Sequence, residues 1–551
     1  KEAKRVCLID KGMFGRSGCT PMGAYSMCAA FGYADPRDNP HVHLEDTIRQ
    51  GRFINNQEQV DVFTKEAPDR ILELVSYGAK FNTEGGRLKQ AIMAGHTYPR
   101  ACFYERRTGQ MIMRTLAHQV RKIPRIRIFE EVIIVDIVIT SDGIHYAIGL
   151  NWANSSFIIF RAPSIVVTTG GCGQIYKYTS TSLDNTGDGI SLMFEAGVEL
   201  SDMEFVQFFP TIVCYPKFPG LGPTATSHVY VHTDAKLYNS LGEEFVGREM
   251  PGWKHQATRD ILSLAIYREI VEGRGSPHGG VFLDATHVPR ETIREGIAVG
   301  GYFDKFLKLG VDLSKQPIET TVTAHFFMGG ARVNIQGETS VPGLFAGGEA
   351  VAGYHGANRL AGNALSEILV SGARAGQFAA LWAVQHTRQC TNAQLLTERL
   401  RSLQKRVSRW RGNGVGLKPI DGKQRLKELM WQKAGLIRDG EEMKKGLNCL
   451  GELETEIDSR LKVSPEARFN RELLDAFELS NMMRVSSLIL QAALAREESR
   501  GAHYRKDYPY PDDEKWLVNI ILKKDQERVA MKFGEVRLTH LDRKGKSEYE
   551  Q

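Results

Sequence analysis

The spacing of apolar and polar residues divides the 551-residue chain into regions of different texture. In the first region, short apolar runs end in glycine-rich turns that precede helical patterns, most clearly at residues 161–171 (RAPSIVVTTGG) and 341–350 (VPGLFAGGEA). Such turns are typical of an α/β sheet, in which ligands bind at the carboxyl ends of the strands. The pattern therefore predicts an α/β fold with a binding site at these turns.

Later regions depart from this pattern. Residues 202–323 are richer in aromatic residues and proline, and the glycine-rich turns resume after them, which predicts an inserted domain that closes over the sheet. After residue 377, apolar residues recur at spacings of three and four, as in 393–410 (AQLLTERLRSLQKRVSRW) and 470–501 (NRELLDAFELSNMMRVSSLILQAALAREESRG), and predict a bundle of amphipathic helices. Alternation in residues 516–533 (WLVNIILKKDQERVAMKF) predicts a short terminal sheet.

The first residues predict a strand without its usual neighbours. Residues 4–12 (KRVCLIDKG) have the pattern of a buried strand that ends in Asp10, and no initiator methionine or earlier strand precedes it. An acid in this place binds the ribose in dinucleotide-binding folds and normally follows a G-x-G-x-x-G loop by about 20 residues. That loop would fall before residue 1, so we expect that the sequence lacks its natural N-terminus. A lone acid at a strand end is more often an ordinary surface residue.

Composition narrows the class of protein. Apolar residues make up 42% and charged residues 25%, as in ordinary globular proteins. The net charge of +6 comes from 71 basic and 65 acidic residues and gives no electrostatic reason to expect nucleic acid. No apolar run reaches the roughly 20 residues of a membrane helix. We therefore expect a soluble chain that can still dock on a membrane partner.

The eight cysteines contain no C-x-x-C pair. Iron-sulfur and zinc sites therefore lack their ligand spacing, and no metal is predicted. Free thiols in a reducing cytosol are the expected state of these residues, namely Cys7, Cys19, Cys28, Cys102, Cys172, Cys214, Cys390 and Cys449.

Three stretches carry candidate chemistry. Residues 168–173 (TTGGCG) would let backbone amides approach a cofactor, although a tight packing turn would look the same. Glu349 could accept hydrogen bonds from the sugar-like chain of a cofactor, or simply complement a helix dipole. Residues 354–366 (YHGANRLAGNALS) surround Arg359 with small residues, as expected where an arginine must meet a small carboxylate beside a flat cofactor.

Six motifs occur in the order found in a known family. They are EFVQFFPT, ATRD, TAHFFMGGARVN, GLFAGGEA, HGANRLAGNALSE and REESRGAHYRKDYP. Together they resemble the flavoprotein subunit of succinate dehydrogenase and fumarate reductase, a family that includes L-aspartate oxidase. The resemblance runs from about Val6 to Trp516.

The resemblance implies a fold class and domain boundaries. We expect an α/β protein with an FAD-binding Rossmann-like sheet, an inserted α+β capping domain and a C-terminal helical bundle domain. The FAD-binding domain would comprise residues 1–201 and 324–377, and the capping domain residues 202–323. Residues 378–505 would form the helical domain and residues 506–551 a small C-terminal domain.

The resemblance also implies redox chemistry at a carbon-carbon bond next to carboxylates, with hydride passing between flavin N5 and one carbon. Arg259 in ATRD matches the family's proton donor, and an ion pair with Asp260 is the ordinary alternative. Arg359 matches the arginine that clamps a substrate carboxylate, and its planar fork suits a bidentate contact. His325 matches a substrate-binding histidine. The residues that correspond to cofactor contacts are Asp10, Lys11, Ser17, Thr20, Gly170, Gly171, Asp188, Glu349, Asn363, Ala364 and Leu365.

Three departures from the family pattern affect function. The family's S-H-T histidine, which bonds covalently to flavin, is absent from residues 16–20 (RSGCT), so we expect non-covalent FAD, a lower flavin potential and a tilt toward reduction of the double bond. Cys19 could replace that linkage, although a small buried thiol is the better interpretation. Phe209 in QFFPT replaces a histidine that holds a carboxylate. The T-E-G-x-R-G proton path has no counterpart in residues 225–240, where His228 or His232 could relay protons or simply lie on the surface.

These departures leave the substrate open. Fumarate, a monocarboxylic enoate, or a succinate derivative with an apolar arm against Phe208 and Phe209 would each fit, whereas L-aspartate oxidation is less favoured because it is expected to need the missing histidine. The competing hypothesis is a flavin-carrying electron-relay subunit of a larger redox complex. Retention of Arg259 and Arg359 argues against a relay. A thiol-disulfide flavoenzyme is disfavoured because no paired cysteines occur.

The resemblance further implies that the partner is an iron-sulfur electron-transfer protein. It places the chain in the cytoplasm, with a peripheral position at the inner face of the membrane as the alternative.

Overall fold

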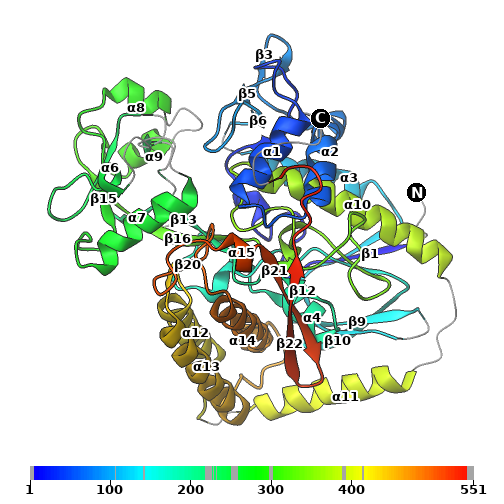
Figure 1. Cartoon of the computed structure of the whole chain (residues 1–551). Helices are drawn as coiled ribbons and strands as arrows, with labels where there is room; N and C mark the ends of the chain where they lie inside the picture. The colour runs from blue at the N-terminus through cyan, green and yellow to red at the C-terminus, as the bar shows by residue number, and fades with distance from the viewer. Residues whose placement is uncertain are drawn as a thin grey trace.

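A computed structural model describes most of the chain (Figure 1). The described residues are 5–105, 107–140, 143–217, 226, 229–230, 233–249, 258–296, 302–386, 393–412 and 415–542. Within them, no helix is long and apolar enough to cross a membrane. The described cysteines form no disulfide bond, as expected, and Cys390 lies outside the described residues.

Parallel strand pairs support the predicted glycine-rich turns. β11 (Ile165–Val167) pairs with β18 (Leu344–Ala346), and Ile165 lies opposite Leu344. β1 (Val6–Ile9) pairs with β7 (Ile126–Phe129). These strands follow the predicted α/β pattern because each short, mainly apolar run ends where the chain turns into a loop or helix. An antiparallel sheet lies beside them, formed by β8 (Val132–Val138), β9 (His145–Asn151) and β10 (Ser156–Ala162).

The prediction that the first strand is buried was wrong. Val6 in β1 is 38% exposed, and Cys7 is exposed as well. Within the described residues, β1 pairs only with β7, and residues 6–9 line a large cavity, so neither the open edge nor that face is covered.

The cap is the group of elements at the upper left of Figure 1. Two long antiparallel strands, β13 (Val206–Tyr215) and β16 (Ile318–Phe327), join it to the rest of the molecule. Alternating apolar residues on these strands are almost completely buried, so the connection is a packed sheet and not a loose linker. The other cap elements are β14 (Lys236–Tyr238), α6 (Val246–Glu249), α7 (Arg259–Val271), β15 (Val281–Asp284), α8 (Arg290–Gly296) and α9 (Tyr302–Lys308).

The predicted helical region begins with two helices that precede the bundle in sequence. α10 (Asn363–Gln385) packs against α2 (Gln57–Ser76), and the expected boundary between residues 377 and 378 falls inside α10. α11 (Ala393–Trp410) runs along the bottom of Figure 1. α12 (Pro419–Lys433), α13 (Gly440–Arg460) and α14 (Arg471–Ala495) pack on one another as the bundle.

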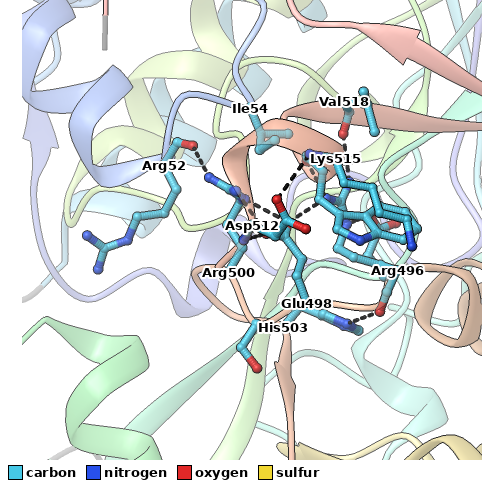
Figure 2. Close-up of polar contacts among 12 residues, drawn as sticks. Arg52, Ile54, Arg496, Glu498, Arg500, His503, Asp512, Lys515 and Val518 are labelled. Carbon is cyan, nitrogen blue, oxygen red and sulfur yellow. Dashed lines mark hydrogen bonds and ion pairs between the residues drawn. The ribbon is translucent and has the colours of Figure 1, made fainter. Parts of the chain in front are cut away.

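The last predicted helix is shorter than its sequence pattern. Residues 496–501 were expected to continue α14, but Arg496 leaves the helix with an extended backbone. Its buried guanidinium binds Glu204 and the carbonyls of Trp516 and Val518. These contacts, seen in part in Figure 2, end the helix where long-range partners become available.

The predicted terminal sheet forms as a hairpin of β21 (Val518–Asp525) and β22 (Arg528–Glu535). β21 also pairs with β12 (Leu200–Ser201), which in turn pairs with β17 (Gly330–Ala331). The hairpin is therefore joined to the point where the chain enters β13 and leaves β16.

Candidate active site

One cavity of about 1780 Å³ runs from the first strand to the cap. Its walls come from the turns after β1, β11 and β18 and from the cap strands. Most of the residues predicted for cofactor and substrate line it, namely Asp10, Lys11, Ser17, Thr20, Gly170, Asp188, Arg259, His325, Glu349, Arg359, Ala364 and Leu365. Gly171 and Asn363 do not. Gly171 lies directly behind Glu349, and Asn363 is fully buried against His43 and Thr47, so their role as cofactor contacts stays a prediction.

The turns that line the cavity leave room for a close ligand. Gly170 (φ +78°) and Gly362 (φ +83°) have left-handed backbones, which glycine adopts without strain. Between these turns, Glu349 Oε1 accepts a hydrogen bond from the Phe327 amide (2.9 Å). Burial raises the pKa of the Glu349 carboxyl to about 7. A buried carboxylate with remaining acceptor capacity suits the hydroxyl groups of a sugar-like chain.

At the end of the cavity next to the cap, two arginines donate hydrogen bonds to one side-chain oxygen. Gln207 Oε1 accepts from Arg259 Nη1 at 3.2 Å and from Arg359 Nη2 at 3.0 Å. Gln207 Nε2 donates to Asn358 Oδ1 and to the Arg359 carbonyl, which fixes the orientation of the amide. No acidic side chain neutralises either arginine among the described contacts, so the pair forms a site for an anion.

Arg259 is the first residue of α7, where the helix dipole disfavours a positive charge. Burial, followed by repulsion from Arg359, lowers the pKa of the Arg259 guanidinium well below its ordinary value. The alternative ion pair with Asp260 does not form: Asp260 Oδ2 accepts from Arg52 Nη2 at 3.0 Å, while Arg259 binds Gln207. The Arg259 guanidinium is therefore held on Gln207 with a pKa below that of an exposed arginine.

His325 enters this end of the cavity from β16. Ser180 Oγ and His325 Nδ1 lie 2.8 Å apart, and the imidazole centre is 4.7 Å from that of Phe209. Burial, with Arg259 and Arg359, lowers the pKa of His325 well below its ordinary value. The imidazole is therefore neutral near pH 7, and with Nδ1 engaged only Nε2 remains for a ligand.

Comparisons with known proteins agree with this geometry. A family model described as an FAD binding domain matches residues 1–365, and one described as fumarate reductase flavoprotein C-term matches residues 423–549. A relative from Methanothermobacter marburgensis, named as one of the subunits of fumarate reductase (CoM/CoB), is 39% identical over 94% of this chain and 93% of its own length. The chain belongs to the succinate dehydrogenase and fumarate reductase flavoprotein family.

Other members of the family extend the likeness. The succinate dehydrogenase flavoprotein subunit of Coxiella burnetii is 30% identical over 95% of this chain and 90% of its own. The structure of Mycobacterium smegmatis Sdh1 with UQ1 has a TM-score of 0.87 at 32% identity and covers 97% of this chain and 90% of that one. The family assignment and the fold class are thus confirmed. This flavoprotein is an FAD-dependent oxidoreductase that acts on CH–CH bonds.

The cavity of this flavoprotein fits FAD. It is long enough to reach from Asp10 to Arg359, and it passes the left-handed glycine turns and the acceptor carboxyl of Glu349. Asp10 Oδ1 accepts from the Gly12 amide and from Ser17 Oγ, so its carboxylate holds the turn after β1 in place.

Lys11 and Asp188 bind each other. Lys11 Nζ lies 2.7 Å from Asp188 Oδ2 and 2.9 Å from Glu478 Oε1 of the helical bundle. Burial opposes the charge of Lys11, but Asp188 and Glu478 outweigh it and raise its pKa. Both residues line the cavity, and their contacts also tie the flavin-binding domain to α14.

The sequence analysis missed the role of Gln207. The residue stands in the recognised stretch QFFPT, but only the structure brings it against Arg259 and Arg359. The proposed relay residues His228 and His232 lie outside the described residues.

Proposed function

We propose that this flavoprotein reduces the C=C bond of a small unsaturated carboxylate, with fumarate as the first candidate, and that Arg259 donates the proton. The observation that carries the proposal is the pair of arginines on Gln207 Oε1, both of them with a pKa lowered chiefly by burial and neither of them in an ion pair with an acid among the described contacts. The relative from Methanothermobacter marburgensis, whose name is that of a fumarate reductase, supports the choice of fumarate.

Each residue of the site has a separate task. Arg359 binds a substrate carboxylate through its fork and withdraws charge from the adjacent double bond. In the tautomer in which Ser180 Oγ donates to Nδ1, the neutral His325 donates a second hydrogen bond from Nε2. Arg259 Nη2 or Nη1 transfers a proton to one alkene carbon, assisted by a site in which burial has already weakened its hold on that proton. FAD, when bound, supplies the hydride to the other carbon. The Phe209 ring lies against the Arg259 guanidinium.

Phe209 also defines the substrate range. It is 7% exposed and has no donor, so a carboxylate that faced it would lose a charge-assisted hydrogen bond. A monocarboxylic enoate, or a dicarboxylate with an apolar arm against Phe208 and Phe209, remains compatible with the site. L-Aspartate oxidation is disfavoured because Phe209 replaces the histidine that this activity is expected to need.

The reaction needs electrons from outside the chain. We infer that their source is an iron-sulfur electron-transfer protein, as the resemblance to this family of flavoprotein subunits implies. A cytoplasmic enzyme that docks at the inner face of the membrane is consistent with this assignment. Non-covalent attachment of FAD is part of the same proposal.

The test is anaerobic. The purified holoenzyme is reduced with a viologen dye, and dye reoxidation is followed on addition of fumarate, crotonate or a 2-alkyl fumarate. Rapid reoxidation by at least one of these acids supports a reductase. Bound flavin with no reoxidation by any of them favours the electron-relay alternative.

Two variants assign the arginines. Arg259→Ala should abolish turnover and retain flavin, and undiminished turnover would remove Arg259 as the acid. Arg359→Lys should raise KM by about 10-fold or more, because a point charge cannot replace the bidentate fork. An unchanged KM would defeat the assignment of Arg359 as the clamp.

A further inference from the structure

The helix that carries Arg259 is held by contacts from three other parts of the chain. At the N-terminus of α7, Asp260 Oδ2 accepts from Arg52 Nη2 at 3.0 Å. Further along, Arg268 Nη2 donates to the Tyr504 hydroxyl at 3.0 Å, and the Tyr267 ring lies 5.8 Å from that of Trp431. The first of these contacts is an ion pair, and it lies one residue from the proposed proton donor.

Asp260 is a buried carboxylate whose cationic partner in the structure is Arg52. Its side chain is 6% exposed, and its second oxygen accepts from the Thr258 hydroxyl. Arg259 is its neighbour in sequence, and a buried carboxylate without a partner attracts any cation within reach. A contact with Asp260 would draw the Arg259 guanidinium away from Gln207, and the negative charge would raise the pKa of Arg259. Arg52 prevents this because it already occupies Asp260.

The position of Arg52 is itself fixed. Arg52 (φ 55°) and Phe53 (φ 64°) are consecutive non-glycine residues with left-handed backbones, a strained conformation that persists only where surrounding contacts impose it. Figure 2 shows the source of one such contact: the Arg52 carbonyl faces Arg500, while its guanidinium points away from that cluster. Arg500 is held in turn by Glu498 at 2.8 Å.

The segment that contains Arg52 also contacts the loop that carries Arg359. The carbonyl of Gly51 accepts a hydrogen bond from the Ala357 amide at 2.9 Å, two residues before Arg359. Asn55 Nδ2 donates to the Tyr354 carbonyl at the start of this loop. Residues 51–55 therefore contact both sides of the substrate site: they reach the loop of Arg359 through Gly51 and Asn55, and the helix of Arg259 through the Arg52 side chain.

We propose that Arg52 is a positioning residue of the active site, which keeps Asp260 neutralised across the boundary between the cap and the flavin-binding domain and so leaves Arg259 on Gln207, free to act on the substrate. The inference rests on the proposed role of Arg259 as proton donor. Arg52 itself touches neither the substrate nor the cofactor, and it acts through Asp260.

The test is a double-mutant cycle in the flavin-loaded enzyme, followed by dye reoxidation with the acid that the wild type reduces. Arg52→Ala should lower kcat at least 10-fold and leave flavin content unchanged, because Asp260 then captures Arg259. Asp260→Asn removes the competing carboxylate and should stay within about threefold of the wild type. The double variant should recover the rate of Asp260→Asn, a rescue that a merely structural role of Arg52 would not produce.

Two further variants serve as controls for the cycle. Arg52→Lys retains the charge and should keep most of the activity, and Arg37→Ala, which breaks the exposed ion pair with Asp35, should change nothing. A double variant as slow as Arg52→Ala, or an Arg52→Ala variant with unchanged kcat, overturns the inference. Failure of the proposed function is recognised separately, since Arg259→Ala would then retain turnover whatever Arg52 does.

Discussion

The guanidinium carbon of Arg259 lies 4.9 Å from the centre of the Phe209 ring. A cation over an aromatic face gains about 0.5–2 kcal/mol, more where water is excluded. The ring thus stabilises Arg259 without offering it a proton acceptor, and it offers a bound carboxylate no donor. One aromatic side chain therefore affects both the proposed acid and the choice of substrate.

Phe209→His should favour dicarboxylates. An imidazole at this position can donate a charge-assisted hydrogen bond worth about 1.5–3 kcal/mol, so KM for fumarate should fall about 10-fold or more, while KM for crotonate should change little. Steady-state dye reoxidation with both acids measures the ratio. Phe209→Leu, which removes the ring and adds no donor, is the control. Equal changes in the two KM values would show that Phe209 does not face the second carboxylate.

Local sequence pattern predicted much of the fold. The strands β11 and β18, the short terminal sheet and the helices α11 and α14 follow from apolar spacing, which reports burial on one face of a strand or helix. The end of α14 at Ala495 did not follow, because Arg496 leaves the helix for partners as distant in sequence as Glu204. The exposure of Val6 was not predicted for a related reason. The apolar pattern shows which residues can be buried, whereas the elements packed against a strand determine which of them are buried.

The candidate site was predicted from motifs more than from pattern. Arg259, His325 and Arg359 were expected together and line one cavity. The shared acceptor Gln207 was not expected, because its role depends on the approach of a helix start and a loop that are 52 and 152 residues away in the sequence. Spacing along a chain carries no information on such contacts.

The flavin should be released by acid. Burial, with the nearby charge of Glu349, raises the pKa of the Cys19 thiol to about 12, so the thiolate that a covalent linkage would need is scarce at neutral pH. Acid precipitation of the holoenzyme should therefore leave the yellow colour in the supernatant. Cys19→Ser should bind as much flavin as the wild type, and colour that stays with the pellet would disprove non-covalent attachment.

Lys11→Met should destabilise the protein. The substitution leaves Asp188 and Glu478 without a shared buried cation, and loss of one partner from a buried ion pair costs about 3–5 kcal/mol. The midpoint of chemical denaturation, followed by helical circular dichroism, should fall clearly. Lys444→Met is the matched control, since its ion pair with Glu441 is exposed and should contribute little to stability. Equal shifts in the two variants would contradict the structural role of Lys11.

Glu349 should make the stability of the flavin-free protein depend on pH. Burial raises the pKa of its carboxyl from 4.5 to about 7 on folding, so the folded state holds a proton that the unfolded state releases between these values. Stability is therefore lost as pH rises from about 4.5 through 7, by up to about 3 kcal/mol at 1.36 kcal/mol per pKa unit. Glu349→Gln lacks this titration.

The measurement compares the unfolding free energies of wild type and Glu349→Gln at pH 5 and pH 8 after flavin removal. From pH 5 to pH 8, the unfolding free energy of Glu349→Gln should rise relative to that of the wild type. Glu349→Asp still titrates, so its unfolding free energy should change with pH as that of the wild type does. Asp202, another buried carboxyl with a raised pKa, is common to all three proteins and cancels in the comparison. Parallel pH curves for wild type and Glu349→Gln would refute the assignment. If Glu349→Gln raises the unfolding free energy only at pH 8, the ionised Glu349 carboxylate destabilises the flavin-free protein. That ionised form is also the one best able to accept hydrogen bonds from a cofactor's hydroxyl groups.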